Sequence, residues 1–408
     1  MINHAPSFDS ALPGTRQRQL DSEKWDRTVD LFEQGNYRES IVSLLESIDS
    51  SMVQGNNNGR SKFVIPHGSI ILYLTIEEDT LNIVAPFLKI PMTTSIPLLR
   101  QVVELNFYPL NLAKITLDRN ELRFKYTESL DLCEPYKTYE VLKEICTYAD
   151  AYDDELIKKF GATHLQAPRI QRFTHKQLIT AWNKFHVYLK EALQYLNYFE
   201  RARAYEFCLD IIDITLKKID YYMSPQGVLR TDLERNISFL QSREIQIQDK
   251  IAKGREYLKQ LQSLNGTEFS RDLYTANIFI PFKTRGTYEN IRSNFERYYN
   301  AARTEIDRKD FIAAVLTIES AFFSLFYYTQ VPEDISRSVT NALVASNRQP
   351  WHQAASVLWR AISEVMNPKV KKKSKGFFSS LLWDEQEQIQ DQKTKKKPKG
   401  FFGALFGK

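Results

Sequence analysis

Hydrophobic residues recur at helical spacing in the first fifty positions of the chain. Trp25, Val29 and Phe32 share one helical face, and a second apolar face follows between residues 37 and 48. The sequence Gly-Asn-Tyr at 35–37 separates the two. The pattern therefore predicts two helices joined by a tight turn.

From Lys62 the hydrophobic period changes to two, which is typical of strands. In LAKITLDRNELRFKYT, Ile115 alternates with polar residues on one strand and Phe124 does so on the next. This alternation predicts an antiparallel hairpin with one buried face. The same reasoning predicts strands in FVIPHGSIILYLTI and TLNIVAPFLKI, an intervening helix in IPLLRQVVELN, and a helix from about residue 136 to 160.

After residue 173 nearly every apolar position steps by three or four, as in helices. Thr174 is placed to cap the first helix. Ser224-Pro225 has the form of a helix start, and the apolar spacing then continues to Asn265-Gly266, which predicts one helix of about 40 residues. The stretch FIAAVLTIESAFFSLFYY is apolar on nearly all sides, so we expect it at the centre of the core.

These elements predict an α+β protein. An N-terminal antiparallel sheet with helices on one face, in the order α-βββ-α-ββ-α, is followed by an all-α helical domain and a disordered basic tail. The predicted divisions are a disordered N-terminus at 1–20, a sheet domain at 21–165, a linker at 166–173, a helical bundle at 174–367 and the tail at 368–408.

The stretch from Leu98 to Leu156 contains a helix ending in Leu105-Asn106, then the alternating hairpin, then a helix with an acidic finish. This order resembles the second half of a type III secretion chaperone-like domain, in the family that includes the YbjN-like regulators. The agreement extends over about residues 21–160. The resemblance implies a domain that binds other polypeptides and often forms homodimers, and it carries over no catalytic residue.

Composition limits the class of protein. The 408 residues suggest two or three domains, and 43% hydrophobic with 26% charged residues is typical of a soluble protein. No run approaches the roughly 18–20 apolar residues of a membrane span, and the first residues lack the pattern of an export signal. The chain has three widely spaced cysteines, Cys133, Cys146 and Cys208, which do not indicate a set of disulfide bonds. We expect them to be buried thiols in a cytoplasmic protein.

No metal-binding spacing, nucleophile motif or dinucleotide-binding turn occurs in the sequence, so we assign no catalytic, cofactor or metal residue. GNNNGRS at 55–61 departs from a phosphate loop and is interpreted as a linker. We expect His186 to be structural and Asp153-Asp154 to be solvated at a helix end. A site assembled between the two domains, in an enzyme or small-ligand binder, stays an alternative.

Near the C-terminus a short sequence motif occurs twice, as KKKSKGFFSSLLW and, 24 residues later, as KKKPKGFFGALFGK. The large apolar residues of each copy follow the spacing i, i+1, i+4, i+5, which places them on one helical face. Eleven lysines and four carboxylates give residues 368–408 a charge of +7, so the rest of the chain, with +5 overall, is at −2. The residues that we assign to membrane or partner binding are Lys371, Lys372, Lys373, Lys375, Phe377, Phe378, Leu381, Leu382, Lys395, Lys396, Lys397, Lys399, Phe401, Phe402, Leu405 and Phe406.

Two kinds of binding target fit this tail. An anionic membrane surface would attract the lysines, at about 1 kcal/mol each, and bury the aromatic rings. A groove on a partner protein would take the four apolar residues of each copy. A lysine-rich terminus without a partner is the third interpretation, and nucleic acid is not expected because lysine alone gives weak, salt-sensitive attraction.

The sequence thus predicts a non-enzymatic adaptor or chaperone-like protein that binds other proteins and has the option of homodimerising. It is expected in the cytoplasm, peripheral at the inner face of the membrane if the tail binds lipid.

Overall fold

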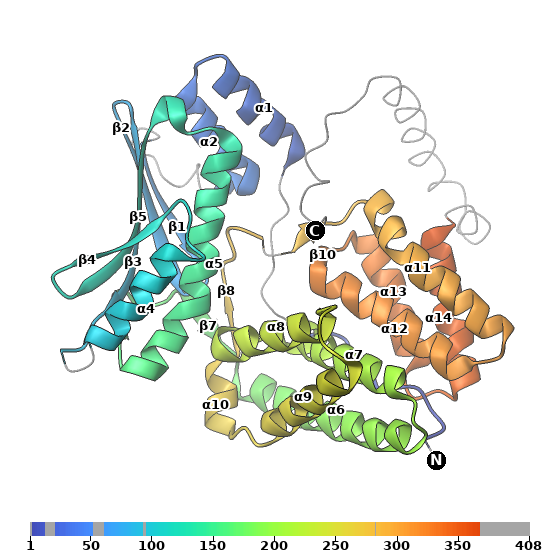
Figure 1. The fold of residues 1–408 in the computed structure, drawn as a ribbon. Coiled ribbons are helices and arrows are strands. Elements are labelled where there is room, and N and C mark those ends of the chain that lie inside the picture. The colour runs from blue at the N-terminus through green and yellow to red at the C-terminus, as the bar shows by residue number, and fades with distance from the viewer. Residues whose placement is uncertain (1, 13–20, 52–60, 93–94, 282, 368–408) are drawn as a thin grey trace.

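The structure, a computed structural model, describes residues 2–12, 21–51, 61–92, 95–281 and 283–367. An N-terminal antiparallel sheet with its helices precedes a mostly helical region (Figure 1). The predicted α+β class is confirmed.

The sheet is antiparallel, with strand order β1-β2-β3-β5-β4, and a short β6 pairs with β3. The predicted hairpin is confirmed, because Ile115 of β4 pairs with Phe124 of β5. Both side chains are buried in the core of this domain. The strands are β1 (Lys62–His67), β2 (Ile70–Glu77), β3 (Thr80–Lys89), β4 (Lys114–Asp118), β5 (Glu121–Ser129) and β6 (Thr163–His164).

Four of the described helices belong to the sheet domain. The first two meet at Gly35, whose φ of +79° is the left-handed conformation that glycine adopts without strain. Helix α5 packs on the sheet against β2 and β3, and its Val141, Leu142 and Ile145 are fully buried. The helices are α1 (Ser22–Glu33), α2 (Tyr37–Ile48), α4 (Ser95–Phe107) and α5 (Pro135–Phe160), with a 3-10 turn η1 (Leu130–Leu132).

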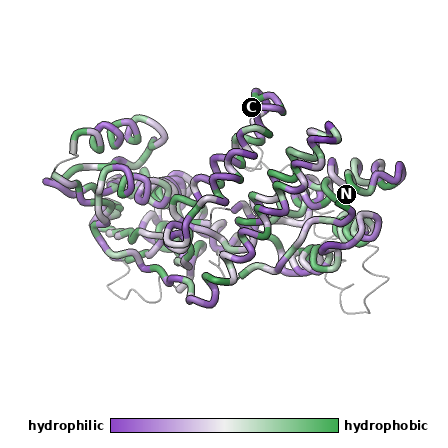
Figure 2. Tube along the Cα trace, turned by 90° about the horizontal axis from the view of Figure 1, so that it is seen from below, coloured by the Kyte–Doolittle hydropathy of each residue, from purple (hydrophilic) through white to green (hydrophobic). Residues whose placement is uncertain are grey.

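The helical domain begins as predicted at Thr174, whose hydroxyl accepts from the backbone N–H of Gln177 in a reciprocal capping box. Figure 2 shows green and purple positions alternating along its helices, as expected where one face is buried. The helices are α6 (His175–Arg201), α7 (Tyr205–Met223), α8 (Gly227–Gln241), α9 (Ile247–Gln262), α10 (Gly266–Arg271), α11 (Tyr288–Asp307), α12 (Phe311–Tyr328), α13 (Glu333–Ser346) and α14 (Trp351–Met366). Short strands are β7 (Ile170–Arg172), β8 (Tyr274–Ala276), β9 (Thr284–Arg285) and β10 (Thr329–Gln330).

Helix α12 is the centre of this domain, as its apolar sequence predicts. It packs against α7, α11 and α14. Contrary to the expectation that no run approaches a membrane span, it is long and apolar enough to cross a bilayer by length and composition, alone among the described helices, with a mean hydropathy of 1.6. However, 67% of it is buried inside the protein.

The single long helix predicted from residue 224 to 265 is wrong. Helix α8 ends at Gln241, and α9 starts at Ile247 and packs against α6 and α7. Breaking the helix lets Leu258 and Leu261 enter the core from a second direction. Ser224 is the left-handed C-cap of α7, and Asn265 caps the start of α10 instead of ending a helix.

The expected loose N-terminus is also wrong for residues 2–12. Ala5 and Phe8 are buried among the side chains of the helical domain. Two core clusters result. One belongs to the sheet domain and includes Phe279 and Ile280, which come more than 100 residues later in the sequence. The other belongs to the helical domain.

Candidate interaction surfaces and the domain junction

The sixteen residues assigned to membrane or partner binding all lie in 368–408, outside the described residues. Most of the 55–61 stretch also lies outside them. The expectations for the thiols and for His186 fall within the described part. The three cysteines are free and buried, and the ring of His186 packs edge-on against Trp182, with ring centroids 4.3 Å apart.

The β1–β2 turn joins the two domains through backbone contacts. Gly68 N donates to Asn277 O at 2.8 Å. His67 Nδ1 accepts from the backbone N–H groups of Phe279 and Ile280 at 3.1 and 3.2 Å. Burial lowers the pKa of His67 to about 3, so the ring is neutral and Nδ1 can accept hydrogen bonds. This histidine holds the 277–280 segment against the sheet.

Buried carboxylates lie beside this turn, on the C-terminal half of α5. The sequence places Asp153 in solvent, and that expectation is wrong: the residue is 1% exposed and accepts from the hydroxyl of Ser69. Asp150 accepts from Ser69 N at 3.3 Å and forms an ion pair with Arg230 of α8 at 3.4 Å. Burial raises the pKa of both carboxyl groups. Packing of α8 against α5 removes them from water.

The start of α8 continues the network. Asp272 Oδ2 accepts from Leu229 N at 2.9 Å, and Arg271 Nε donates to Asp272 Oδ1 at 2.7 Å. Gly227 has a φ of +58°, and a Cβ there would collide with the carboxylate of Asp154. Burial and the neighbouring Asp272 charge raise the pKa of Asp154 to about 6.

Polar groups thus converge between the domains, which is where the enzyme alternative required a site. These groups are engaged with one another and with backbone amides, which is the arrangement of a structural network. Within the described residues no three His, Cys, Asp or Glu side chains are grouped to hold a metal ion. The three surface hollows described below have no junction residue in their lining.

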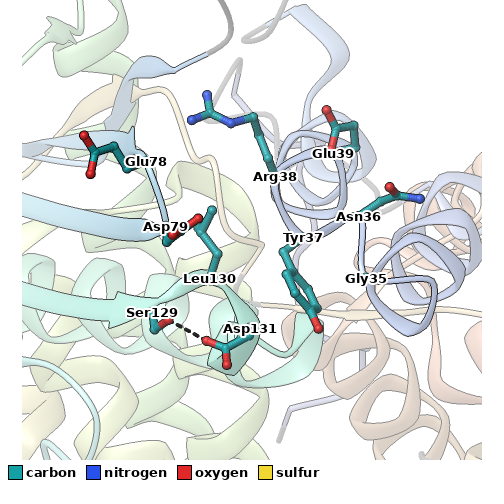
Figure 3. Close-up of a pocket in the computed structure, with 10 residues that line it drawn as sticks. All are labelled: Gly35, Asn36, Tyr37, Arg38, Glu39, Glu78, Asp79, Ser129, Leu130 and Asp131. Atoms are coloured by element: carbon teal, nitrogen blue, oxygen red, sulfur yellow. Dashed lines mark hydrogen bonds between the residues drawn. The ribbon is translucent and has the colours of Figure 1, made fainter.

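The first hollow, of about 600 Å³, lies between the start of α2, the β2–β3 turn and the end of β5. Figure 3 shows Arg38 across from Glu78 and Asp79, and the Ser129 hydroxyl bonded to Asp131. The carboxylates that line it are exposed, so water screens their charge. We assign no chemistry to this hollow.

The other two hollows are also on the outside. One, of about 560 Å³, lies between α13 and α14, where Ala342 and Val357 form part of the floor and Arg337 and Arg360 part of the lining. The other, of about 420 Å³, lies over β2 and β3 near Gln166. Neither gathers buried titratable groups.

The most distinctive surface is on α4. One face of this helix packs into the core through Leu98, Val102 and Leu105. On the other side Ile96, Val103 and Phe107 are 65%, 65% and 90% exposed. Their spacing of i, i+7 and i+11 makes a single stripe on a helix.

Met92 and Tyr108 lie just outside the two ends of α4 and are also exposed, by 94% and 77%. We call these five residues the α4 stripe. Large side chains exposed together in this way mark an interaction surface more often than single exposed residues do. The sequence held a signal for it, because α4 has more apolar positions than one buried face requires.

The charges of α4 lie beside the stripe. Arg100 and Glu104 are the charged residues of this helix, and both are exposed. They lie four residues apart and on the same flank of the stripe.

No protein-family model matches the chain, and a search of curated proteins finds no match. Function is therefore inferred from the geometry of the chain itself.

Proposed function

We propose that the protein is a non-enzymatic, protein-binding adaptor that pairs with a second copy of itself through the α4 stripe and docks to an anionic membrane surface through its duplicated tail. The observation that carries this proposal is the α4 stripe with its two flanking charges.

The charges beside the stripe are self-complementary. When two helices pack antiparallel, like flanks of the two helices meet. With the twofold axis near residue 102, Arg100 of each copy faces Glu104 of the other. The same residues on both copies then form an isologous contact, which is the commonest way that identical chains pair.

The stripe is also large enough to matter. Phe and Tyr side chains each bury roughly 150–250 Å², and a standard interface buries roughly 800 Å² per partner. Phe107 and Tyr108, with Met92, Ile96 and Val103, therefore supply an apolar centre for an interface of ordinary size.

Charge reversal tests the pairing. Arg100→Glu should weaken the dimer because the new carboxylate would face Glu104 of the second copy, and Glu104→Arg should weaken it by the mirror-image repulsion. The double variant restores opposite charges and should restore the dimer. Sedimentation equilibrium or light scattering after size exclusion measures the dissociation constant, with an expected loss of about tenfold for each single variant.

Val103→Glu places a charge in the stripe and should give a monomer. Val344→Glu, at an exposed valine of α13 in the helical domain, is the matched control for an added carboxylate. A wild-type chain that is monomeric at high concentration, or a double variant no tighter than either single one, would contradict the proposal.

The tail adds the second attachment. Two lysine-rich copies on each chain make four copies in a dimer, and linked weak attachments gain strongly from avidity. Each copy combines charge attraction with partial burial of aromatic rings, and stable anchoring takes two such signals.

The chain truncated after Met366 should lose binding to vesicles that contain about 30% phosphatidylserine, while the whole chain sediments with them and releases in high salt. Serine at Phe377, Phe378, Phe401 and Phe402 should remove most of the binding with all lysines retained. If the truncated and whole chains sediment equally, the membrane role is wrong. If the whole chain binds a protein partner and does not bind the vesicles, the tail binds a groove on that protein.

A further inference from the structure

The N-terminal segment, residues 2–12, lies across the helical domain without forming a helix of its own. Ala5 N donates to Gln349 O and Leu12 N donates to Tyr222 O, both at 2.8 Å. These contacts connect it to the α13–α14 corner and to α7. We call the residues that hold it the segment seat.

The backbone of Ser7 is held by two ions. Ser7 N donates to both carboxylate oxygens of Glu191, at 3.1 and 3.0 Å, and the Ser7 hydroxyl donates to Glu191 Oε2 at 2.7 Å. Lys218 Nζ donates to Ser7 O at 2.9 Å and lies 3.7 Å from Glu191 Oε2. All three residues are buried. A buried ion pair thus engages the N–H, the carbonyl and the side chain of one residue.

The residue that follows is an aromatic anchor. Phe8 is 4% exposed, with its ring 5.6 Å from that of Tyr221 and 6.2 Å from that of Phe323. Its backbone N–H donates to Asn347 Oδ1 at 3.2 Å. On the other side of Ser7, Ala5 is fully buried, so the seat accepts a small residue there.

A third ionisable group lies near the ion pair. Glu319 of α12 is 3% exposed and close enough to Lys218 and Glu191 for their charges to act on it. Its Oε2 has no hydrogen-bond partner among the described residues. The seat is therefore polar around Ser7 and aromatic around Phe8, which suits an extended backbone followed by an aromatic side chain.

Recognition of this kind uses the main chain for affinity and buried side chains for specificity, as sites for extended peptides do. The partners of the segment are far away in sequence: 184 residues separate Ser7 from Glu191 and 339 separate Phe8 from Asn347. The contacts that the helical domain makes with its own N-terminal segment are contacts that a peptide from another chain could also make.

We propose that the segment seat is a peptide-binding site, occupied in cis by residues 2–12, that takes in trans an extended peptide with a small residue, a serine and an aromatic residue at the positions of Ala5, Ser7 and Phe8. This site stands apart from the α4 stripe and the tail, and its failure would leave both untouched.

The test uses the full chain with a protease recognition sequence inserted between Pro13 and Leu20 and cut after folding. The probe is a fluorescently labelled peptide of residues 1–12, followed by anisotropy. The cut protein should exchange its own fragment for the probe in a saturable manner. The uncut protein should bind the probe far more weakly, because a tethered segment competes at an effective concentration near millimolar.

Peptide variants show which contacts hold the peptide. N-methylation of Ser7 removes the N–H that Glu191 accepts, and it should weaken binding at least about tenfold, as should Phe8→Ala. Ser7→Ala should weaken binding less, and Ser10→Ala, at an exposed position, is the matched control with no change. On the protein side, Asn347→Ala should lower affinity with folding intact.

Three results would overturn the proposal. The cut protein could keep its fragment and bind no probe while unfolding cooperatively, or it could unfold once cut, and in both cases the segment is part of the fold alone. Equal binding of the Ser7, Phe8 and Ser10 variants would show that the seat does not read the peptide.

Discussion

Arg230→Met should lower the free energy of unfolding by about 3–5 kcal/mol at pH 7, because removing one partner of a buried ion pair leaves the other charge without compensation. Arg230 is 16% exposed and bonds both Asp150, at 3.4 Å, and Glu234, at 2.8 Å. Its methionine replacement has a similar apolar stem and no charge. Urea denaturation followed by circular dichroism measures the change.

A second substitution should offset the destabilisation by Arg230→Met, and an exposed arginine provides the control. Asp150→Asn in the Arg230→Met background removes the stranded carboxylate and should recover part of the loss, which a double-mutant cycle quantifies. Arg235→Met, five residues further along α8, removes an ion pair with Asp232 whose members are 63% and 40% exposed. That change should cost less than about 1 kcal/mol. Equal losses in the two arginine variants would show that the junction is not held by Arg230.

Glu319→Gln should make the loss of stability that the wild-type protein shows above pH 6.5 shallower by the contribution of one buried carboxyl group. Burial raises the pKa of Glu319 from 4.5 to about 8, opposed by Lys218 and reinforced by Glu191. Because the folded-state pKa lies above that of the unfolded chain, the folded state retains a proton that the unfolded state releases. The stability from this proton is complete below about pH 4.5 and is lost as pH rises through about 8.

Between pH 6.5 and 9 the wild-type protein should therefore lose about 2 kcal/mol through this group. The window avoids His67, whose lowered pKa makes stability rise with pH only up to about 6.5. Burial also raises the pKa of Asp210, to about 7, and those of Asp153, Cys133, Cys146 and Cys208, so these groups add losses in the same direction. The difference in slope between the wild-type protein and Glu319→Gln isolates the share of Glu319. Urea midpoints at pH 6.5, 8 and 9 measure the slope.

Glu333→Gln, at a position whose side chain is 86% exposed, is the control and should leave the slope unchanged. A Glu319→Gln slope as steep as that of wild type would mean that Glu319 does not hold a proton near neutral pH.

Features set by neighbouring residues were predictable from the sequence. The Gly35 turn, the pairing of Ile115 with Phe124 and the capping box of Thr174 with Gln177 all depend on residues close in the chain. The burial of α12 followed from its composition alone, because a helix that is apolar all round has no face for water.

The errors share a different cause. The apolar spacing of α8 and α9 fits one helix, and only the chance to pack Leu258 and Leu261 on α7 explains the break between them. Asp153 looked solvated because Ser69, whose hydroxyl it accepts from, lies 84 residues earlier in the chain.

The candidate surfaces divide in the same way. The sequence pointed to the tail, whose repeated lysine and phenylalanine pattern is visible in one dimension, but it did not identify the α4 stripe or the segment seat. Which of the two apolar faces of α4 is covered depends on where the sheet lies, and the grip on Ser7 depends on Glu191 and Lys218 from two other helices.

By itself the sequence determined the kind and order of the elements and the repeated tail, because local periodicity, turns and caps act over a few residues. Tertiary structure alone decided which charges are buried, which apolar face of α4 stays in water and where residues 2–12 lie. Those outcomes depend on desolvation and packing between segments that are distant in the chain, and burial is a property of the whole fold.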